Sequence, residues 1–312
     1  MTAERAAPGR PAGGALGWQC AGVRWSAAGD AALVWRHPAR GERVSPLPPG
    51  RPLAFTTGAG RSCAGVRRGQ RHTPCPAVAA ISPTAVSAQC PECARLDRSY
   101  SVAADTRADD PRPYDVYLAW FGPHWIKVGI TATEREGVRL LEQAALSATL
   151  LGRGPLMAAR RAEAVLGAAL AVPDRIPYAA KRAARLDPPP TSARAAELHA
   201  LHARAHALAA LPESLRPEPC APVHHDTAFA LDRVRAVGPS ALVLLAPHCT
   251  VAGTVEAVVG PDVLLRDVEG RGLLLDGRQL AGWPLAAADP ASATTAPLRP
   301  PPAEPLAPEA LF

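Results

Sequence analysis

The stretch Tyr114-Asp-Val-Tyr-Leu-Ala-Trp-Phe-Gly-Pro-His-Trp-Ile-Lys-Val-Gly-Ile-Thr131 decides how the middle of this chain folds. Apolar residues alternate along both sides of the central Gly-Pro-His, which is typical of two antiparallel strands joined by a tight turn. We therefore expect a β-hairpin with one apolar face directed toward a core. That face is formed by Val116, Leu118, Trp120, Ile126, Val128 and Ile130.

The opposite face of this hairpin carries its polar side chains. The register expected from the turn places Tyr117 across from Gly129 and Ala119 across from Lys127. Gly129 has no side chain, so it leaves room beside the Tyr117 ring. Tyr117 and Lys127 are therefore expected on one and the same face.

Two helices are expected after the hairpin. The first begins at a threonine N-cap, has Glu136 in its first turn and carries Arg139 and Gln143 on its solvent side. Its buried stripe consists of Leu141, Ala144, Ala145 and Ala148. The second helix spans residues 155–172, between two prolines.

Glu163 lies in the second predicted helix, on the same face as Leu166 and Leu170. A carboxylate beside an apolar stripe is unusual unless it is paired or bound to a metal ion. An ion pair with Arg160, three residues earlier, is the alternative to a metal-binding role.

This block, about residues 113–171, resembles the core of the GIY-YIG nuclease superfamily. Asp115-Val116-Tyr117 stands where the first motif would be, and Lys127-Val128-Gly129 stands where the second would be. Arg139 matches the arginine of the first helix, and Glu163 matches the glutamate of a later helix. The whole chain also resembles an uncharacterised actinobacterial family that joins this core to an upstream cysteine module.

The resemblance implies a role for each of these residues. Tyr117 would activate or orient the attacking water, Arg139 would stabilise charge on the phosphate, and Glu163 would hold Mg²⁺ or Mn²⁺. Lys127 replaces the tyrosine of the second motif. A lysine can bind phosphate as a point charge, but it replaces a phenol as a base only if its pKa is depressed.

Four cysteines fall within 31 residues: Cys63, Cys75, Cys90 and Cys93. The last two form a CxxC motif, a spacing that lets two thiolates reach one tetrahedral ion. The segment from Cys63 to Cys93 is rich in loops, which favours stabilisation by structural zinc bound to four thiolates. Cys63 and Cys75 are further apart than the two cysteines of a usual zinc knuckle. His72, which lies between them, is therefore a candidate to replace one of them as a ligand. Unliganded cysteines and redox CxxC chemistry are the alternatives.

Basic residues are concentrated in one part of the chain. Residues 151–204 contain nine basic and four acidic residues, a difference of five against a net charge of +6 for the whole chain. A solvated helical surface is the alternative to phosphate contact here. The arginines and the lysine expected to contact DNA or RNA are Arg67, Arg68, Arg71, Lys181, Arg182 and Arg185.

A second metal hypothesis rests on a row of histidines. His199, His202 and His206 have helical spacing, and His224-His225-Asp226 follows after a proline-rich segment. Imidazoles on one helical stripe can converge on an ion. An Ala-rich helix with exposed histidines needs no ligand, and this is the alternative.

Composition limits the class of protein. The 312 residues are 48% hydrophobic and 20% charged, which is enough for a sizeable buried core. No window approaches a membrane span and no apolar signal segment is evident, so we expect a cytoplasmic protein without a membrane partner. Seven cysteines without an export signal argue against a disulfide framework. The sequence gives no indication of the oligomeric state.

Proline-rich segments divide the chain into expected units. Short strands separated by Gly, Pro and Asp turns occur near both ends, and a weak repeat suggests that these two β-units pack together. The units are a β-rich segment (15–60), the zinc module (61–100), the GIY-YIG-like core (101–187), a helical linker (193–225), a second β-rich segment (226–285) and a disordered tail (286–312).

We therefore expect an α+β protein with a GIY-YIG-like hairpin–helix core, a four-cysteine zinc module and flanking small β-units. The leading functional hypothesis is a nucleic-acid-processing phosphodiesterase or endonuclease that uses Mg²⁺ or Mn²⁺ and carries structural Zn²⁺. One alternative is a non-catalytic, zinc-stabilised nucleic-acid-binding protein. Another is a protein-interaction scaffold.

Overall fold

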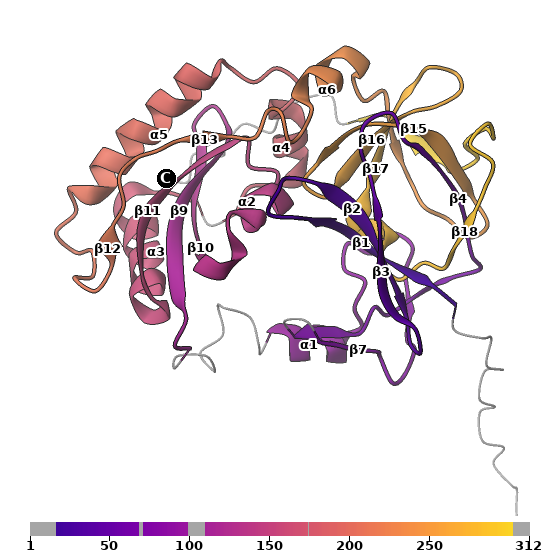
Figure 1. Ribbon diagram of the computed structural model, residues 1–312, viewed down its shortest axis with the longest axis horizontal. Helices are drawn as coiled ribbons and strands as arrows, with labels where there is room; N and C mark the ends of the chain where they lie inside the picture. Colours follow the sequence, from indigo (N-terminus) through magenta and orange to yellow (C-terminus); the bar gives the residue numbers. More distant parts are fainter. Residues whose placement is uncertain (1–16, 69–70, 99–109, 174, 302–312) are drawn as a thin grey trace, which may run out of the picture.

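The computed structural model describes residues 17–68, 71–98, 110–173 and 175–301 of the chain (Figure 1). They form a mixed α+β protein that is rich in sheets and carries a cluster of four cysteines. Two larger sheets lie on opposite sides of the molecule in Figure 1, and the cysteine-containing segment with α1 lies below them.

The central sheet is antiparallel and has the strand order β10-β9-β11-β12, with β13 also paired to β11. Its strands are β9 (Pro113–Gly122), β10 (Trp125–Ala132), β11 (Ser147–Pro155), β12 (Arg216–Pro217) and β13 (Val223–His224). Strands β9 and β10 form the expected hairpin. Tyr117 pairs with Gly129 and Ala119 pairs with Lys127, which confirms the predicted register.

Helices cover both faces of this sheet. Helices α3 (Leu156–Leu170) and α5 (Thr191–His206) pack on the face that contains Leu118 and Trp120. The other face carries Tyr117, Ala119 and Phe121 and is covered from α2 (Val138–Glu142) and α4 (Tyr178–Ala184). The apolar face predicted from the alternation of side chains is therefore the face that contacts α3 and α5.

The first predicted helix is shorter than expected. A 3-10 turn, η2 (Thr133–Arg135), precedes α2, and Ala144 has a left-handed backbone with φ 62°. Ala148, expected in the buried stripe of this helix, instead lies in β11 and pairs with Ala119 of β9. Pairing with a distant strand outweighs the helical preference of alanine here. The second predicted helix is confirmed as α3.

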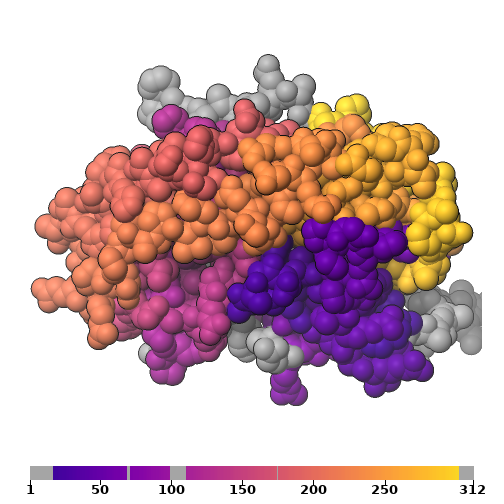
Figure 2. All heavy atoms as spheres, turned by 45° about the horizontal axis from the view of Figure 1, so that its top comes forward, coloured from indigo at the N-terminus to yellow at the C-terminus, as the bar shows by residue number. Residues whose placement is uncertain are grey.

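The two ends of the chain meet in a second, seven-stranded sheet of order β18-β4-β15-β16-β17-β14-β19. Its members are β4 (Pro52–Thr57), β14 (Ala241–Val243), β15 (Thr250–Val259), β16 (Asp262–Arg266), β17 (Gly272–Asp276), β18 (Leu285–Ala287) and β19 (Leu298–Arg299). The short helices α6 (Leu231–Val237) and α7 (Gly277–Leu280) accompany it. In Figure 2 the indigo N-terminal segment lies directly against the orange and yellow C-terminal segment.

A small sheet of β1 (Gln19–Trp25), β2 (Ala31–His37) and β3 (Gly41–Pro46) packs against this larger sheet. The indole nitrogen of Trp25 donates to the carbonyl of Gly260 at 2.7 Å. The backbone nitrogen of Cys20 donates to the carbonyl of Trp283 at 3.0 Å. The two β-rich segments thus share one core, although only β4 joins the C-terminal sheet itself.

The expected disordered tail needs correction over its first part. Residues 286–301 contain the end of β18 and all of β19, which pairs with β14. Backbone nitrogens of Thr295 and Ala296 donate to the carbonyl of Thr250. These main-chain bonds order a segment whose composition alone suggests disorder. Residues 302–312 lie outside the described residues.

A buried ion network fastens α4 to the seven-stranded sheet. Both carboxylate oxygens of Asp262 accept from Arg182, at 2.6 and 2.9 Å, and Arg185 lies 2.9 Å from the same carboxylate. Arg182 also reaches Asp276 at 2.9 Å. The side chain of Asp262 is 0% exposed, so its charge depends on these guanidinium groups for compensation.

We expect Asp262→Asn to destabilise the protein by about 3–5 kcal/mol, because it leaves two buried guanidinium groups without their shared charge partner. Asp232→Asn, which removes an exposed i,i+3 partner of Arg235, should cost no more than about 1 kcal/mol. Urea unfolding of both variants measures the difference. Equal stability of the two variants would mean that the network does not hold the sheets together.

Candidate functional site

Tyr117 lies at the centre of the polar face of the hairpin. Its side chain is 2% exposed, and its hydroxyl accepts a hydrogen bond from the Nε2 atom of Gln143 at 2.8 Å. A Cβ atom built on Gly129 would lie 2.4 Å from this hydroxyl, so only glycine allows the phenol to reach its position. The sequence predicted the room beside the Tyr117 ring but not the bond from Gln143.

The electrostatic surroundings of Tyr117 include two other predicted site residues. Burial raises the pKa of Tyr117, whereas the bond from Gln143 and the charge of Arg139 lower it. The charge of Glu163 acts in the opposite direction and raises it. Arg139 stands on α2 with a largely exposed side chain, and it lies 3.7 Å from Glu142.

Glu163 stands on α3, which packs against the other face of the hairpin. It is partly buried and is close enough for its charge to affect Tyr117. The predicted residues Tyr117, Lys127 and Arg139 therefore share one side of the sheet, and Glu163 approaches from a helix on the opposite side.

Lys181 belongs to the same site, which the sequence did not indicate. Its side chain is 6% exposed, and its Nζ atom donates to the backbone carbonyl of Gln143 at 3.0 Å. The ammonium group lies 3.8 Å from the ring centroid of Phe121 and 4.9 Å from that of Tyr178. Burial, and then the charge of Lys127, lower the pKa of Lys181 to about 7.

Arg278 and Tyr178 extend this site toward the seven-stranded sheet. The guanidinium of Arg278 lies 3.7 Å from the ring centroid of Tyr178 and is paired with Asp276. Burial raises the pKa of Tyr178 to about 12. About a hundred residues separate these two side chains in the sequence, so no local pattern could have brought them together.

The expected solvent-facing patch of Lys181, Arg182 and Arg185 does not form. Lys181 and Arg185 are buried, and Arg182 binds two carboxylates. The charges of Arg182 and Arg185 serve the attachment of α4 to the seven-stranded sheet, which the charge count alone could not reveal. By contrast, the other three predicted phosphate-binding arginines, Arg67, Arg68 and Arg71, are exposed on the hairpin of β6 (Val66–Arg68) and β7 (Arg71–Thr73).

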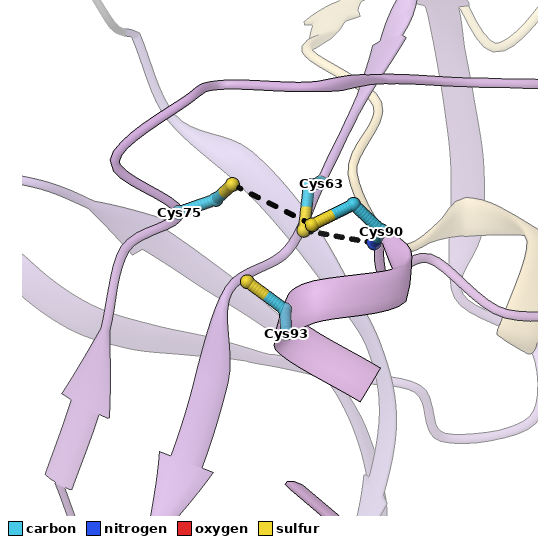
Figure 3. A group of neighbouring side chains, drawn as sticks. All are labelled: Cys63, Cys75, Cys90 and Cys93. Atoms are coloured by element: carbon cyan, nitrogen blue, oxygen red, sulfur yellow. Dashed lines mark hydrogen bonds between the residues drawn. The ribbon is translucent and has the colours of Figure 1, made fainter. Parts of the chain in front are cut away.

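The four predicted cysteines converge at a separate centre (Figure 3). Their sulfur atoms all lie within 4.8 Å of one another, and all four residues are buried. The sulfurs of Cys75 and Cys90 are 3.9 Å apart, and the backbone nitrogen of Cys90 donates to the sulfur of Cys63 at 3.2 Å. This is a donor set that can bind a metal ion.

Local structure explains how Cys63 and Cys75, which are twelve positions apart in the sequence, come together at this centre. Strands β6 (Val66–Arg68) and β7 (Arg71–Thr73) form a hairpin between Cys63 and Cys75, so the hairpin returns the chain to its starting point. Helix α1 (Pro91–Arg98) begins directly after Cys90 and places Cys93 in its first turn. Short strands β5 (Arg61–Ser62) and β8 (Ala80–Ile81) pair beside them.

Histidines play no part in the cluster. The Nε2 atom of His72, the predicted substitute ligand, lies 2.6 Å from the carbonyl of Ala64. His202 contacts the carbonyl of Glu218, and its ring lies tilted against that of His206, with ring centroids 4.4 Å apart. Among the described residues, the row of helical histidines forms no metal-binding group.

The protonation of the cysteine centre would change if a cation bound there. Burial and the neighbouring thiols raise the pKa of Cys93, because several thiolates this close together repel one another. A divalent ion removes that penalty and keeps the ligands deprotonated. The residues present therefore fit a metal ion.

The fold and this centre define a mixed α+β protein with a four-cysteine site that could hold a metal ion. Residues 50–285 match the model of a family described as a protein of unknown function (DUF2797), and the chain belongs to this family. The matched range includes β4, the cysteine centre and the Tyr117 site, and it leaves out β1 to β3.

Comparisons with curated proteins and with solved structures found no match. No helix in the described ranges is long and apolar enough to cross a membrane.

The cysteine centre predicts that the purified protein carries about one thiolate-bound metal ion per chain. Cys90→Ser combined with Cys93→Ser should abolish this metal and unfold the segment around α1. Cys220→Ser, which changes a cysteine outside the cluster, should leave the metal content unchanged. Elemental analysis with thermal unfolding provides the measurement. A fully folded, metal-free wild-type protein would contradict the assignment.

The buried amine of Lys181 predicts a pH dependence of stability. Between about pH 7 and 10 the unfolded chain holds a proton on this lysine that the folded protein has released. The free energy of unfolding should therefore rise with pH across this range. In Lys181→Met this contribution is absent, so the stability difference between the two proteins should change with pH. Parallel stability curves in urea unfolding would contradict the burial of a neutral amine.

Proposed function

We propose that this protein is a divalent-metal-dependent phosphodiesterase that acts on nucleic acid through a GIY-YIG-like core. The observation that supports this most is the arrangement around Tyr117, whose phenol is affected by the charges of both Arg139 and Glu163. These three residues are the ones that the resemblance to the superfamily assigns to water activation, phosphate stabilisation and metal binding. They come from three different elements, β9, α2 and α3.

The order of elements around the site also supports the proposal. A hairpin comes first, a short helix with the arginine follows, and a third strand then pairs with the first strand of the hairpin. This arrangement places Tyr117 on the central strand β9 and Arg139 above the same face.

Each residue has a chemical task in this proposal. Arg139 is exposed enough to meet a phosphate, and its guanidinium would stabilise the charge that develops there. Tyr117, oriented by Gln143, would position the attacking water. A divalent ion at Glu163 would supply Lewis-acid stabilisation of the phosphodiester.

We propose zinc as the metal of the cysteine centre, in a structural role. Four thiolates within reach of one another match the closed tetrahedral set typical of structural zinc. The surrounding segment has short strands and little regular structure, so a bound ion would supply stability that packing does not.

A non-catalytic nucleic-acid-binding protein is the second candidate. Lys127 in place of the second tyrosine favours it, because binding needs a charge whereas cleavage needs a base. The exposed arginines Arg67, Arg68 and Arg71 on the β6–β7 hairpin serve binding equally in both candidates.

Cleavage of DNA and RNA substrates with Mg²⁺ or Mn²⁺ tests the proposal. Glu163→Gln should reduce the rate by about 10²–10³ or more without loss of folding. Glu213→Gln, at an exposed glutamate, is the matched control and should keep full activity. If wild type and Glu163→Gln are both inactive, yet both bind nucleic acid with an affinity that falls steeply with salt, the protein binds nucleic acid without cleaving it. If the protein neither cleaves nor binds nucleic acid, the remaining hypothesis is a protein-interaction scaffold.

A further inference from the structure

The use of lysine in this chain is highly selective. Lys and Arg together number 34, but the sequence contains only two lysines, Lys127 and Lys181. Every other basic side chain of this group is arginine. The two differ chemically because a guanidinium keeps its proton in proteins, whereas an amine can lose it. A site that needs a removable proton therefore requires lysine.

Both lysines are found at the same face of the β9–β10 hairpin, Lys127 on β10 itself and Lys181 on the helix α4 that covers it. Lys127 of β10 pairs with Ala119, and Lys181 of α4 extends over the ring of Phe121, two residues further along β9. Side chains two residues apart on a strand point to the same side. Tyr117 also belongs to this face. A chain with two lysines in 312 residues thus places both at the Tyr117 site.

Burial away from carboxylates opposes a charge on the Lys181 amine, whereas the carbonyl and the aromatic rings that it contacts can accommodate an ammonium. Its contacts are a backbone carbonyl and two aromatic rings, and among the described residues it makes no ion pair with a carboxylate. The charged groups that act on it are Lys127 from β10, Arg139 from α2, Arg278 from α7 and Asp262 from β16.

Three of these four groups are positive. The fourth, Asp262, is already bound to Arg182 and Arg185. The repulsion and the burial together bring the pKa of Lys181 down to about 7.

We propose that Lys181 is a titratable positioning residue of the Tyr117 site, whose amine takes up a proton when a phosphate-type anion binds there. Such an anion would sit between Arg139 and Lys127, and its charge would offset the repulsion that these cations exert on the Lys181 amine. The proposal rests on the proposed function in taking a phosphodiester as the ligand.

Protonation of Lys181 also has a structural consequence. The ammonium donates to the carbonyl of Gln143, and the side chain of Gln143 donates to the hydroxyl of Tyr117. Uptake of a proton would strengthen the first of these bonds, because a charged donor binds a carbonyl more strongly than a neutral one. The arrival of the anion is thereby coupled to the fixing of Tyr117.

The direction of the pH effect follows from linkage. Below about pH 7 Lys181 is already protonated, and anion binding requires no proton uptake. Above this pH, binding must take up a proton, so the affinity falls until the pKa of the complex is reached. Each unit by which binding raises the pKa of Lys181 corresponds to about a tenfold loss of affinity.

Nuclear magnetic resonance of the intact protein labelled with ¹³C at the lysine Cε positions tests this directly. The spectrum contains two signals, and the Lys127→Arg variant identifies which belongs to Lys181. We expect the Lys181 signal to titrate near pH 7 and its midpoint to move up by at least about one unit, equivalent to tenfold in affinity, when a short DNA duplex is added without divalent metal. A short RNA duplex tests the second source of phosphodiesters.

Two variants separate this role from simple packing. In Lys181→Arg the charge is permanent, so DNA affinity should remain but lose its dependence on pH around 7. In Lys127→Gln one repelling charge is removed, so the midpoint of the Lys181 signal should rise even without DNA. A merely structural lysine would leave the pH dependence of DNA affinity unchanged in Lys181→Arg, whereas the Lys127→Gln shift shows only that the two amines interact.

The outcomes of this experiment are independent of cleavage. A Lys181 signal that titrates near pH 10 like an ordinary lysine, or that ignores both duplexes, overturns the inference even if the protein cleaves nucleic acid. A signal that responds to DNA or RNA in a protein that never cleaves supports the inference and rejects only the phosphodiesterase.

Discussion

The buried carboxylate of Asp262 is the constraint on which the arrangement of this molecule depends. It stands at the beginning of β16, has no exposed surface, and is compensated by two arginines of α4. A helix held in this way cannot slide along the central sheet without breaking buried, charge-assisted bonds. The aromatic and amine groups of α4 consequently meet the hairpin in one position. Two sheets formed by different parts of the chain thus create a single chemical environment.

The protein uses two different means of stabilisation. The two large sheets share an apolar core that extends from the N-terminal strands to β17 and includes Trp120 and Trp283. The cysteine segment has only a small cluster of its own, formed mainly by the four cysteines and Val66. A segment with so little buried apolar surface needs another source of order, and a metal ion bound by the four cysteines would supply it. The two parts should therefore respond differently to chelators.

Sequence patterns predicted the local features well and the distant ones poorly. The alternation of apolar and polar side chains predicted the register of β9 and β10. The CxxC motif identified Cys90 and Cys93, two of the four residues of the cysteine centre. The prediction that Ala148 belongs to a helix failed because its partner in the sheet, Ala119, lies outside any local window. The burial of Lys181 was equally invisible, since its helix α4 is attached through Arg182 to a carboxylate eighty residues later in the chain. The predicted roles of Glu163 and Arg139 remain predictions.

Strand β4 has a consequence for how the protein is made. It pairs with β15 and β18, whose residues follow roughly two hundred positions later in the sequence. A strand leaving the ribosome so long before its partners presents unpaired main-chain groups to other nascent chains. Closure of so long a loop also slows folding more than it weakens the final structure. Efficient synthesis of this protein should therefore depend on chaperones that shield the early strand until the last third of the chain has emerged.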